Sequence, residues 1–245
     1  MTKPPSTSTL RKRITRLIQL FLKEVDFDSF QGTTAWRHTP GRIEIVHIKF
    51  IRPCDTTIIG CTTASFSLEQ GLFFESFPNN QVMKFSQWLP EPYGASMRNF
   101  HRRTIAQPAL KRRDIWLVEQ DGSNLEECVA DAIKILQLKA EPWFVRFRND
   151  SEVINTLLNE LDQVDEIGLL QSWNGGLNCP HRNHLVAYVA LGAGELEIAR
   201  DAFERLLNQN RPKLMAGYPD RDYKKVVELL EQARPAKSNA GANET

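Results

Sequence analysis

The feature that most constrains the fold is the block from Gly32 to Phe74, GTTAWRHTPGRIEIVHIKFIRPCDTTIIGCTTASFSLEQGLFF. Within it, Thr33–His38, Arg42–Ile51 and Thr62–Phe74 are rich in β-branched and aromatic residues, and Pro40-Gly41 between the first two is a turn signal. Alternating apolar and polar residues are typical of strands, because successive side chains point to opposite faces of a sheet. The block therefore predicts a short strand followed by two long strands.

The second of these segments changes phase midway. Its apolar residues move from Ile43 and Ile45 to Val46 and Ile48. A shift of one residue turns side chains to the opposite face, so we expect either a β-bulge at this step or a strand covered on both faces. Gly71, near the end of the third segment, indicates another bulge or a close backbone approach.

Helical periodicity surrounds these strands. From Leu10 to Val25 apolar residues recur every three or four positions, which predicts an amphipathic helix capped by Ser8 or Thr9. Its other faces carry Arg11, Lys12, Arg13, Arg16 and Lys23. Further helices are predicted after a capping box at Ser123 and Glu126, after Glu141-Pro142, from Ser151, at 181–210 as a hairpin broken at 192–194, and at 220–233. Residues 114–120 are predicted to form a fourth strand, and the proline-punctuated stretch 77–110 to be irregular.

These elements predict an α+β fold: an antiparallel sheet of about four or five strands with helices packed on one face, plus a C-terminal helical subdomain. The expected organisation is a flexible N-terminus at 1–8, an α+β domain at 9–165, a helical hairpin plus terminal helix at 181–234 and a disordered tail at 235–245.

Composition is ordinary for a folded protein, with 41% hydrophobic and 25% charged residues and a formal net charge of +1. No apolar run approaches the roughly 20 residues that span a bilayer, and the start of the chain lacks the features of a secretory signal. The four cysteines are scattered, so we expect reduced thiols, a cytoplasmic protein, no membrane association and no cofactor.

The strongest indication of a partner is a basic cluster. From Pro92 to Arg113 there is no acidic residue. The stretch contains Arg98, His101, Arg102, Arg103, Lys111, Arg112 and Arg113. Arginine presents a planar fork of donors that suits phosphates and carboxylates, so this segment predicts a site for an acidic protein or a nucleic acid. The alternative is that the arginines pair with acids elsewhere or lie on a solvated surface loop.

Cys179, His181 and His184 have the spacing of half a metal site, C-x-H-x-x-H. The sequence shows no other cluster of cysteine and histidine to complete it. Two polar histidines at the surface of a helix that opens with Pro180 are the favoured interpretation, so no metal is expected. Similarly, Trp36 is expected to be buried with Arg37 at its rim.

No G-x-S-x-G, H-E-x-x-H or glycine-rich phosphate loop occurs, so no reaction is indicated. Ala199-x3-Phe203, after a break at Gly192–Gly194, is similar to part of one tetratricopeptide repeat. A single repeat makes no solenoid, so we expect a helical hairpin that packs on the main domain or receives a partner.

Several short motifs carry a family resemblance. They are G-x-x-x-W-R from Gly32, F-S-L-x-x-G-L-F from Phe66, I-W-L from Ile115, and a later Pro-Trp-Phe, in the order helix, strands, loop and helix. From Leu10 to Leu161 the chain resembles the bacterial family called domain of unknown function four-three-zero-four. It departs from the family by a single Trp116 where a pair is common and by the basic insertion 111–113. The resemblance implies no established activity.

Three functional hypotheses follow. The leading one is a non-enzymatic binding protein that uses the basic cluster for an acidic partner. The second is an enzyme acting on a phosphorylated or nucleic-acid substrate, with His101 as acid or base and the arginines as an anion clamp. The third is a structural adaptor that docks a partner through the C-terminal helices.

Overall fold

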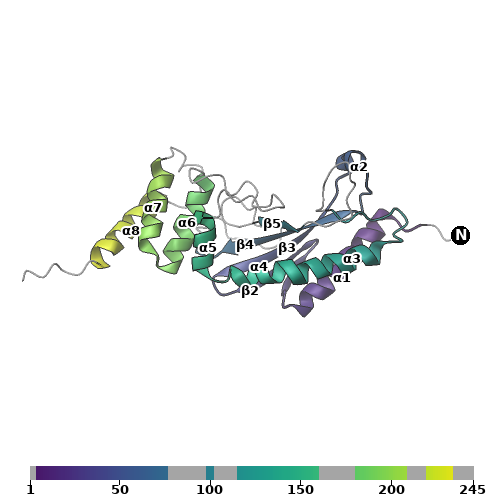
Figure 1. Ribbon diagram of the computed structural model, residues 1–245, viewed down its shortest axis with the longest axis horizontal. Coiled ribbons are helices and arrows are strands. Elements are labelled where there is room, and N and C mark those ends of the chain that lie inside the picture. The colour runs from purple at the N-terminus through teal and green to yellow at the C-terminus, as the bar shows by residue number, and fades with distance from the viewer. Residues whose placement is uncertain (1–3, 77–97, 102–114, 160–179, 209–218, 234–245) are drawn as a thin grey trace, which may run out of the picture.

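The computed structural model describes residues 4–76, 98–101, 115–159, 180–208 and 219–233 (Figure 1). One antiparallel sheet of five strands has the order β1-β2-β3-β4-β5, so each strand pairs with its neighbours in sequence. The strands are β1 (Ser29–Gln31), β2 (Thr34–Thr39), β3 (Arg42–Phe50), β4 (Phe66–Phe74) and β5 (Arg98–His101). The α+β class with a C-terminal helical region is confirmed.

The two long strands pair without interruption. Nine consecutive pairs run from Arg42 opposite Phe74 to Phe50 opposite Phe66, and β2 pairs with β3 in equally regular register. No bulge therefore occurs at the phase shift. Instead β3 is buried on both faces, with Ile45 3% and Val46 1% exposed, which is the second of the two expected explanations.

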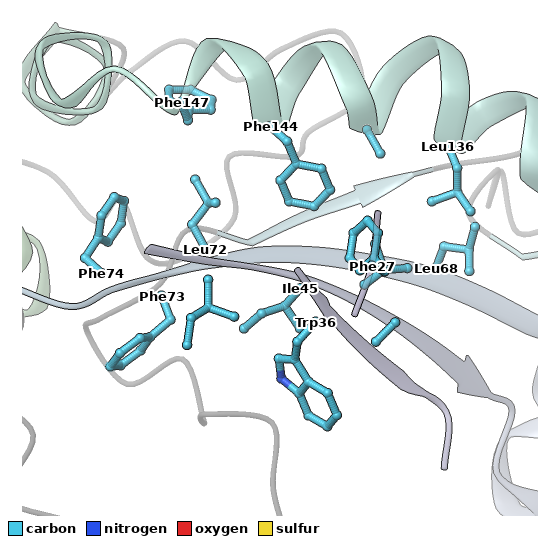
Figure 2. Packing of buried hydrophobic residues seen from close by; sticks show 14 of the residues in the cluster. Phe27, Trp36, Ile45, Leu68, Leu72, Phe73, Phe74, Leu136, Phe144 and Phe147 are labelled. Carbon is cyan, nitrogen blue, oxygen red and sulfur yellow. The ribbon is translucent and has the colours of Figure 1, made fainter. Parts of the chain in front are cut away.

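Helices cover one face of the sheet (Figure 1). They are α1 (Thr7–Glu24), α3 (Leu125–Ile135), the π-helical segment η2 (Leu136–Ala140) and α4 (Glu141–Arg146), the last three being continuous in sequence. Figure 2 shows Leu136 and Phe144 pointing toward β4, where Leu72 points back at them. Trp36 and Phe73 point the other way and are also buried. Both faces of the sheet therefore belong to the core.

Helix α1 begins earlier than its periodicity indicated. It starts at Thr7, inside the stretch expected to be flexible, and its N-cap is Ser6, not Ser8 or Thr9. The Ser6 hydroxyl accepts a hydrogen bond from the Thr9 amide at 3.2 Å, which satisfies one of the free donors of the first turn. The expected apolar stripe is confirmed as buried: Leu10, Ile14, Ile18, Phe21 and Leu22.

A short helix, α2 (Pro53–Ile59), lies between β3 and β4 along the chain. Proline in its first turn has a backbone angle suited to a helix start, and Gly60 ends it in the left-handed conformation at φ 71°. Cys54 lies in the first turn of α2 and Cys61 follows its end, and neither forms a disulfide with a described residue.

The segment expected to be a fourth strand is not one. Of residues 115–120, Trp116 alone joins the sheet, through one isolated bridge to Phe66, on whose ring it stacks at 5.3 Å. Its indole donates to Asp131 of α3 at 2.9 Å, so the segment is tied to helix and sheet alike. The sheet instead gains β1, which was not predicted, and β5, from the stretch predicted to be irregular.

The predicted capping box before α3 is also wrong. Asn124 occupies the N-cap, and the amide of Ser123 bonds to the Asp121 carboxylate at 3.0 Å instead. The Asn124 side chain is hydrogen-bonded to the preceding segment: it accepts a hydrogen bond from the Glu119 amide and donates one to the Leu117 carbonyl.

Four helices pack side by side at one end of the sheet (Figure 1). They are α5 (Asp150–Asn159), α6 (Pro180–Ala193), α7 (Leu196–Asn208) and α8 (Pro219–Ala233). The expected hairpin and terminal helix are confirmed. Gly192 of α6 lies so close to the chain after β4 that an added Cβ would meet Ser76 at 2.6 Å. In the described part of the chain, no helix combines the length and apolarity needed to cross a membrane.

Candidate anion-binding groove

The structure describes part of the predicted basic site. Arg98 and His101 are the first and last residues of β5 and lie opposite Gly71 and Leu68 of β4. The remaining predicted site residues, Arg102, Arg103, Arg112 and Arg113, lie outside the described residues, as does Lys111. Convergence of this segment on one ligand therefore stays a prediction.

The candidate metal site is described at one residue, His184. Its ring is 1% exposed and meets Tyr188 edge to face at 5.2 Å, so the expectation of a surface histidine is wrong here. The reason is that α6 packs between α5 and α7, which buries every residue from 183 to 190. Cys179 and the side chain of His181 lie outside the described part. No described group of three or more His, Cys, Asp or Glu side chains could hold a metal ion.

A different feature has the geometry of a binding site. A groove of about 600 Å³ runs along α1. We call it the basic groove and define it by its lining residues: Thr7, Ser8, Arg11, Lys12, Thr15, Arg16, Gln19, Gly32, Thr33, Phe50, Pro53 and Thr63. Three of these side chains are cationic, five carry hydroxyls, and no carboxylate is among them. Its volume lies in the roughly 300–1,000 Å³ range of small-molecule sites.

The basic groove forms because one face of α1 stands against distant parts of the chain. Positions 8, 11, 12, 15, 16 and 19 repeat at the three- and four-residue spacing that places side chains on one side of a helix. The opposite wall combines the β1–β2 turn at Gly32-Thr33, the end of β3 at Phe50, the start of α2 at Pro53, and Thr63.

Hydrogen bonds hold the two walls together at two places. The Arg11 guanidinium donates to the Thr63 carbonyl at 2.8 Å and to the Ile51 carbonyl at 3.1 Å. Eight residues further along α1, the Gln19 side chain donates to the Gly32 carbonyl at 2.9 Å. The width of the groove is therefore set by the fold before any ligand arrives.

The charge in this groove is not neutralised by the described part of the protein. Arg11, Lys12 and Arg16 form no ion pair with any described carboxylate, whereas Arg13 on the neighbouring face of α1 pairs with Glu126 of α3. Lys12 and Arg16 are also four residues apart, where like charges on a helix repel each other. The groove is consequently a local positive site in a chain of net charge +1.

Arg11 differs from the other two cations in being fixed. Its guanidinium lies over the Phe50 ring, 4.9 Å from the ring centroid, in addition to its two carbonyl contacts. Those contacts use two of the five N–H donors of a guanidinium and leave its positive charge uncompensated, since carbonyls are neutral. Arg11 is thus an oriented donor at the wall of the groove, while Lys12 and Arg16 are exposed.

A second group of charged side chains differs from the basic groove, because its members form ion pairs with one another. We call Arg37, Glu44, Glu141 and Arg148 the ion network. Glu44 is fully buried and accepts from Arg37 Nε at 2.5 Å and from Arg148 Nε at 2.8 Å, and Arg37 also donates to Glu141 at 3.0 Å. The Glu44 carboxylate raises the pKa of Arg148 above its ordinary value.

The ion network joins the sheet to the helical layer, because Arg37 and Glu44 belong to β2 and β3 and Glu141 to α4. Arg37 is 6% exposed and stacks over Phe27 at 4.7 Å, so the expectation that it lies at the rim is wrong. Arg42 makes a parallel link, donating to the Phe147 carbonyl and to Asp150. With two positive and two negative charges in mutual contact, the ion network is a structural fastening.

The sequence signal for the basic groove was present but incomplete. The pattern of Arg11, Lys12 and Arg16 on the polar side of α1 is readable in the sequence. The opposing wall, however, comes from residues 32 to 63, and their position against α1 depends on the whole sheet.

Comparison with known proteins adds no relative: no protein-family model, no curated protein and no solved structure matches this chain. The family resemblance described above therefore stays a prediction.

Proposed function

We propose that this protein is a non-enzymatic binding protein whose basic groove takes a phosphate-bearing ligand of the nucleic-acid class. The observation that carries the proposal is the presence of three cations, Arg11, Lys12 and Arg16, on a concave surface where no described carboxylate pairs with them. Cations in a groove raise the local concentration of an anionic partner and favour its binding.

The shape of the site favours a phosphate ligand over an acidic protein. A stable protein interface involves roughly 20–30 residues on each partner. The basic groove is a smaller concave surface, lined by 12 residues. Its hydroxyls, from Thr7, Ser8, Thr15, Thr33 and Thr63, are the neutral groups that commonly accompany Arg and Lys in contacts with phosphate oxygens.

The other two hypotheses gain no comparable support. No His, Cys, Asp or Glu lines the basic groove, so its lining offers no side chain for acid–base work near neutral pH. The adaptor hypothesis expects an apolar exposed surface on the C-terminal helices. The described parts of α6, α7 and α8 present no exposed large hydrophobic residue.

The test is the salt dependence of binding to a fluorescently labelled single-stranded oligonucleotide, followed by anisotropy. Wild type should bind, with affinity falling as salt rises. The double variant Lys12→Gln/Arg16→Gln should bind more weakly and flatten the log–log salt slope by about 1.4, since each phosphate contact contributes about 0.7 for single strands.

Arg13→Gln is the matched control. It removes the same charge from the same helix, but from a residue that already pairs with Glu126. It should keep nearly the wild-type affinity and slope. The proposal fails if wild type does not bind, if both variants behave alike, or if a polyglutamate peptide binds the groove more tightly than the oligonucleotide.

A further inference from the structure

The fixed geometry of Arg11 indicates which form of phosphate the basic groove recognises. We infer that Arg11 anchors a terminal phosphate monoester, and that it determines the specificity of the groove for that group over internal phosphodiesters. This inference rests on the proposed function and makes it more specific.

The charge of the basic groove favours a monoester. A phosphate monoester carries about −1.5 to −2 charges near neutral pH, with three acceptor oxygens, whereas a phosphodiester carries one charge. The groove gathers three positive charges from Arg11, Lys12 and Arg16 within a single concavity and has no carboxylate in its lining. Such a site is matched better by a doubly charged group than by a singly charged one.

The orientation of the Arg11 guanidinium also suits a phosphate group. A guanidinium binds phosphate through parallel N–H donors, and it binds best when its plane is held in place beforehand. Arg11 is held by the Thr63 and Ile51 carbonyls and by the Phe50 ring at 4.9 Å. Because Arg11 is already held in place, its remaining N–H donors can bind a ligand with little further loss of side-chain freedom.

The size and rigidity of the groove also favour a small terminal group. Its volume is about 600 Å³, and its two walls are tied to each other at Arg11 and again at Gln19. A terminal phosphate with the first part of the molecule that carries it matches such a space. Two sources share this chemistry, a free nucleotide and the phosphorylated end of a nucleic-acid strand.

The experiment compares one labelled oligonucleotide with a 5′-phosphate and with a 5′-hydroxyl, using unlabelled nucleoside 5′-monophosphate and the unphosphorylated nucleoside as competitors. Wild type should prefer the phosphorylated strand on the order of tenfold, as expected for additional charge-assisted hydrogen bonds. If the monophosphate competes and the nucleoside does not, a free nucleotide is sufficient for binding in the groove. If the phosphorylated strand is preferred but the monophosphate does not compete, the ligand is the phosphorylated end of a strand.

Three variants separate anchoring from simple attraction. Arg11→Lys keeps the charge but loses the planar fork, so the preference should fall to about twofold or less while the hydroxyl strand binds nearly as before. Lys12→Gln should weaken the binding of both strands, and it should reduce the preference for the phosphorylated strand less than Arg11→Lys does. Arg11→Lys also loses contacts with backbone carbonyls, so thermal melting is needed to check that this variant folds. Phe50→Leu tests the same inference without changing Arg11. It removes the ring that orients the guanidinium and should reduce the preference for the phosphorylated strand.

Each failure has its own signature. If wild type binds both strands equally, the inference about Arg11 is wrong while the proposed function stands. If Arg11→Lys and Phe50→Leu keep the full preference, a terminal phosphate is recognised elsewhere and the inference is again wrong. If neither strand binds, the proposed function fails with it.

Discussion

The basic groove and the ion network contain the same kinds of side chain in opposite states. In the ion network, Arg37 and Arg148 surround a fully buried Glu44 at hydrogen-bonding distance. In the basic groove, Arg11, Lys12 and Arg16 have no described carboxylate partner. The difference teaches that pairing, and not the number of arginines, separates a structural cluster from a candidate binding site. It also predicts effects of opposite sign on stability when Glu44 of the ion network and when the exposed cations Lys12 and Arg16 are replaced.

The largest effect is expected in the ion network. Glu44→Gln should lower the free energy of unfolding by about 3–5 kcal/mol, because it breaks the buried ion pair of Arg37 and Glu44 and also removes the counter-charge of the exposed Arg148. Urea denaturation followed by circular dichroism measures the change. Glu127→Gln, at an exposed position of α3, is the control and should change stability by about 0.5 kcal/mol or less. Equal stability of the two variants would contradict the structural assignment of the network.

Replacing Arg11 should have an intermediate effect on stability. Arg11 makes structural contacts, as the ion network does, but like Lys12 and Arg16 it has no described carboxylate partner. Arg11→Gln loses two hydrogen bonds to backbone carbonyls and a contact over the Phe50 ring. We expect a loss of about 1–2 kcal/mol in the free energy of unfolding. A loss as large as that of Glu44→Gln would show that Arg11 is mainly structural, and the same denaturation experiment decides this.

The two exposed cations of the groove should behave in the opposite way. Lys12 and Arg16 stand four residues apart on α1, so their mutual repulsion destabilises the helix. Lys12→Gln/Arg16→Gln should therefore raise the free energy of unfolding by about 0.2–0.5 kcal/mol, while it weakens oligonucleotide binding. Thermal melting without ligand measures the gain. A clear loss of stability would mean that these residues have structural partners.

The smallest effect belongs to a pair that is formed but exposed. Burial alone would raise the pKa of Asp28, but hydrogen bonds from Ser29 and His38 outweigh it and lower that pKa. A lowered pKa contributes stability above the unfolded value near 3.9, which is lost as pH falls through the folded pKa. Asp28→Asn should cost a few tenths of a kcal/mol near neutral pH, at the low end of the roughly 0.2–1 kcal/mol of exposed pairs, and nothing at strongly acid pH. Urea denaturation at both pH values measures it, and a difference that grows toward acid would contradict the assignment.

Much of the fold was predictable from local patterns. The apolar stripe of α1, the pairing segments of β2, β3 and β4, and the break between α6 and α7 are all set by periodicity and by turn residues close in sequence. The phase shift of β3 predicted burial on both faces as one of two options, and the regular register decided between them.

The errors share a physical cause, because tertiary contacts prevailed over local signals. Ser123 and Glu126 form a capping pattern, but Asn124 takes the cap while its side chain binds residues 117 and 119. Trp116 makes one bridge instead of a strand, since its indole is held by Asp131 of α3.

The candidate site shows the same limit. The cations of α1 could be read from the sequence, but the wall they face is assembled from four separate parts of the chain, which no local pattern specifies. Likewise, the burial of Arg37 depends on Glu141, which lies more than a hundred residues away in sequence.

The most direct test of the contrast between paired and unpaired cations is amide chemical-shift mapping by solution NMR during titration with the 5′-phosphorylated oligonucleotide. We expect the largest shifts at the groove, in the amides of residues 7 to 19 and of Thr33 and Thr63, and unchanged amides at Arg37, Glu44 and Arg148. Shifts centred on the ion network, or on any surface that leaves α1 unchanged, would contradict the account.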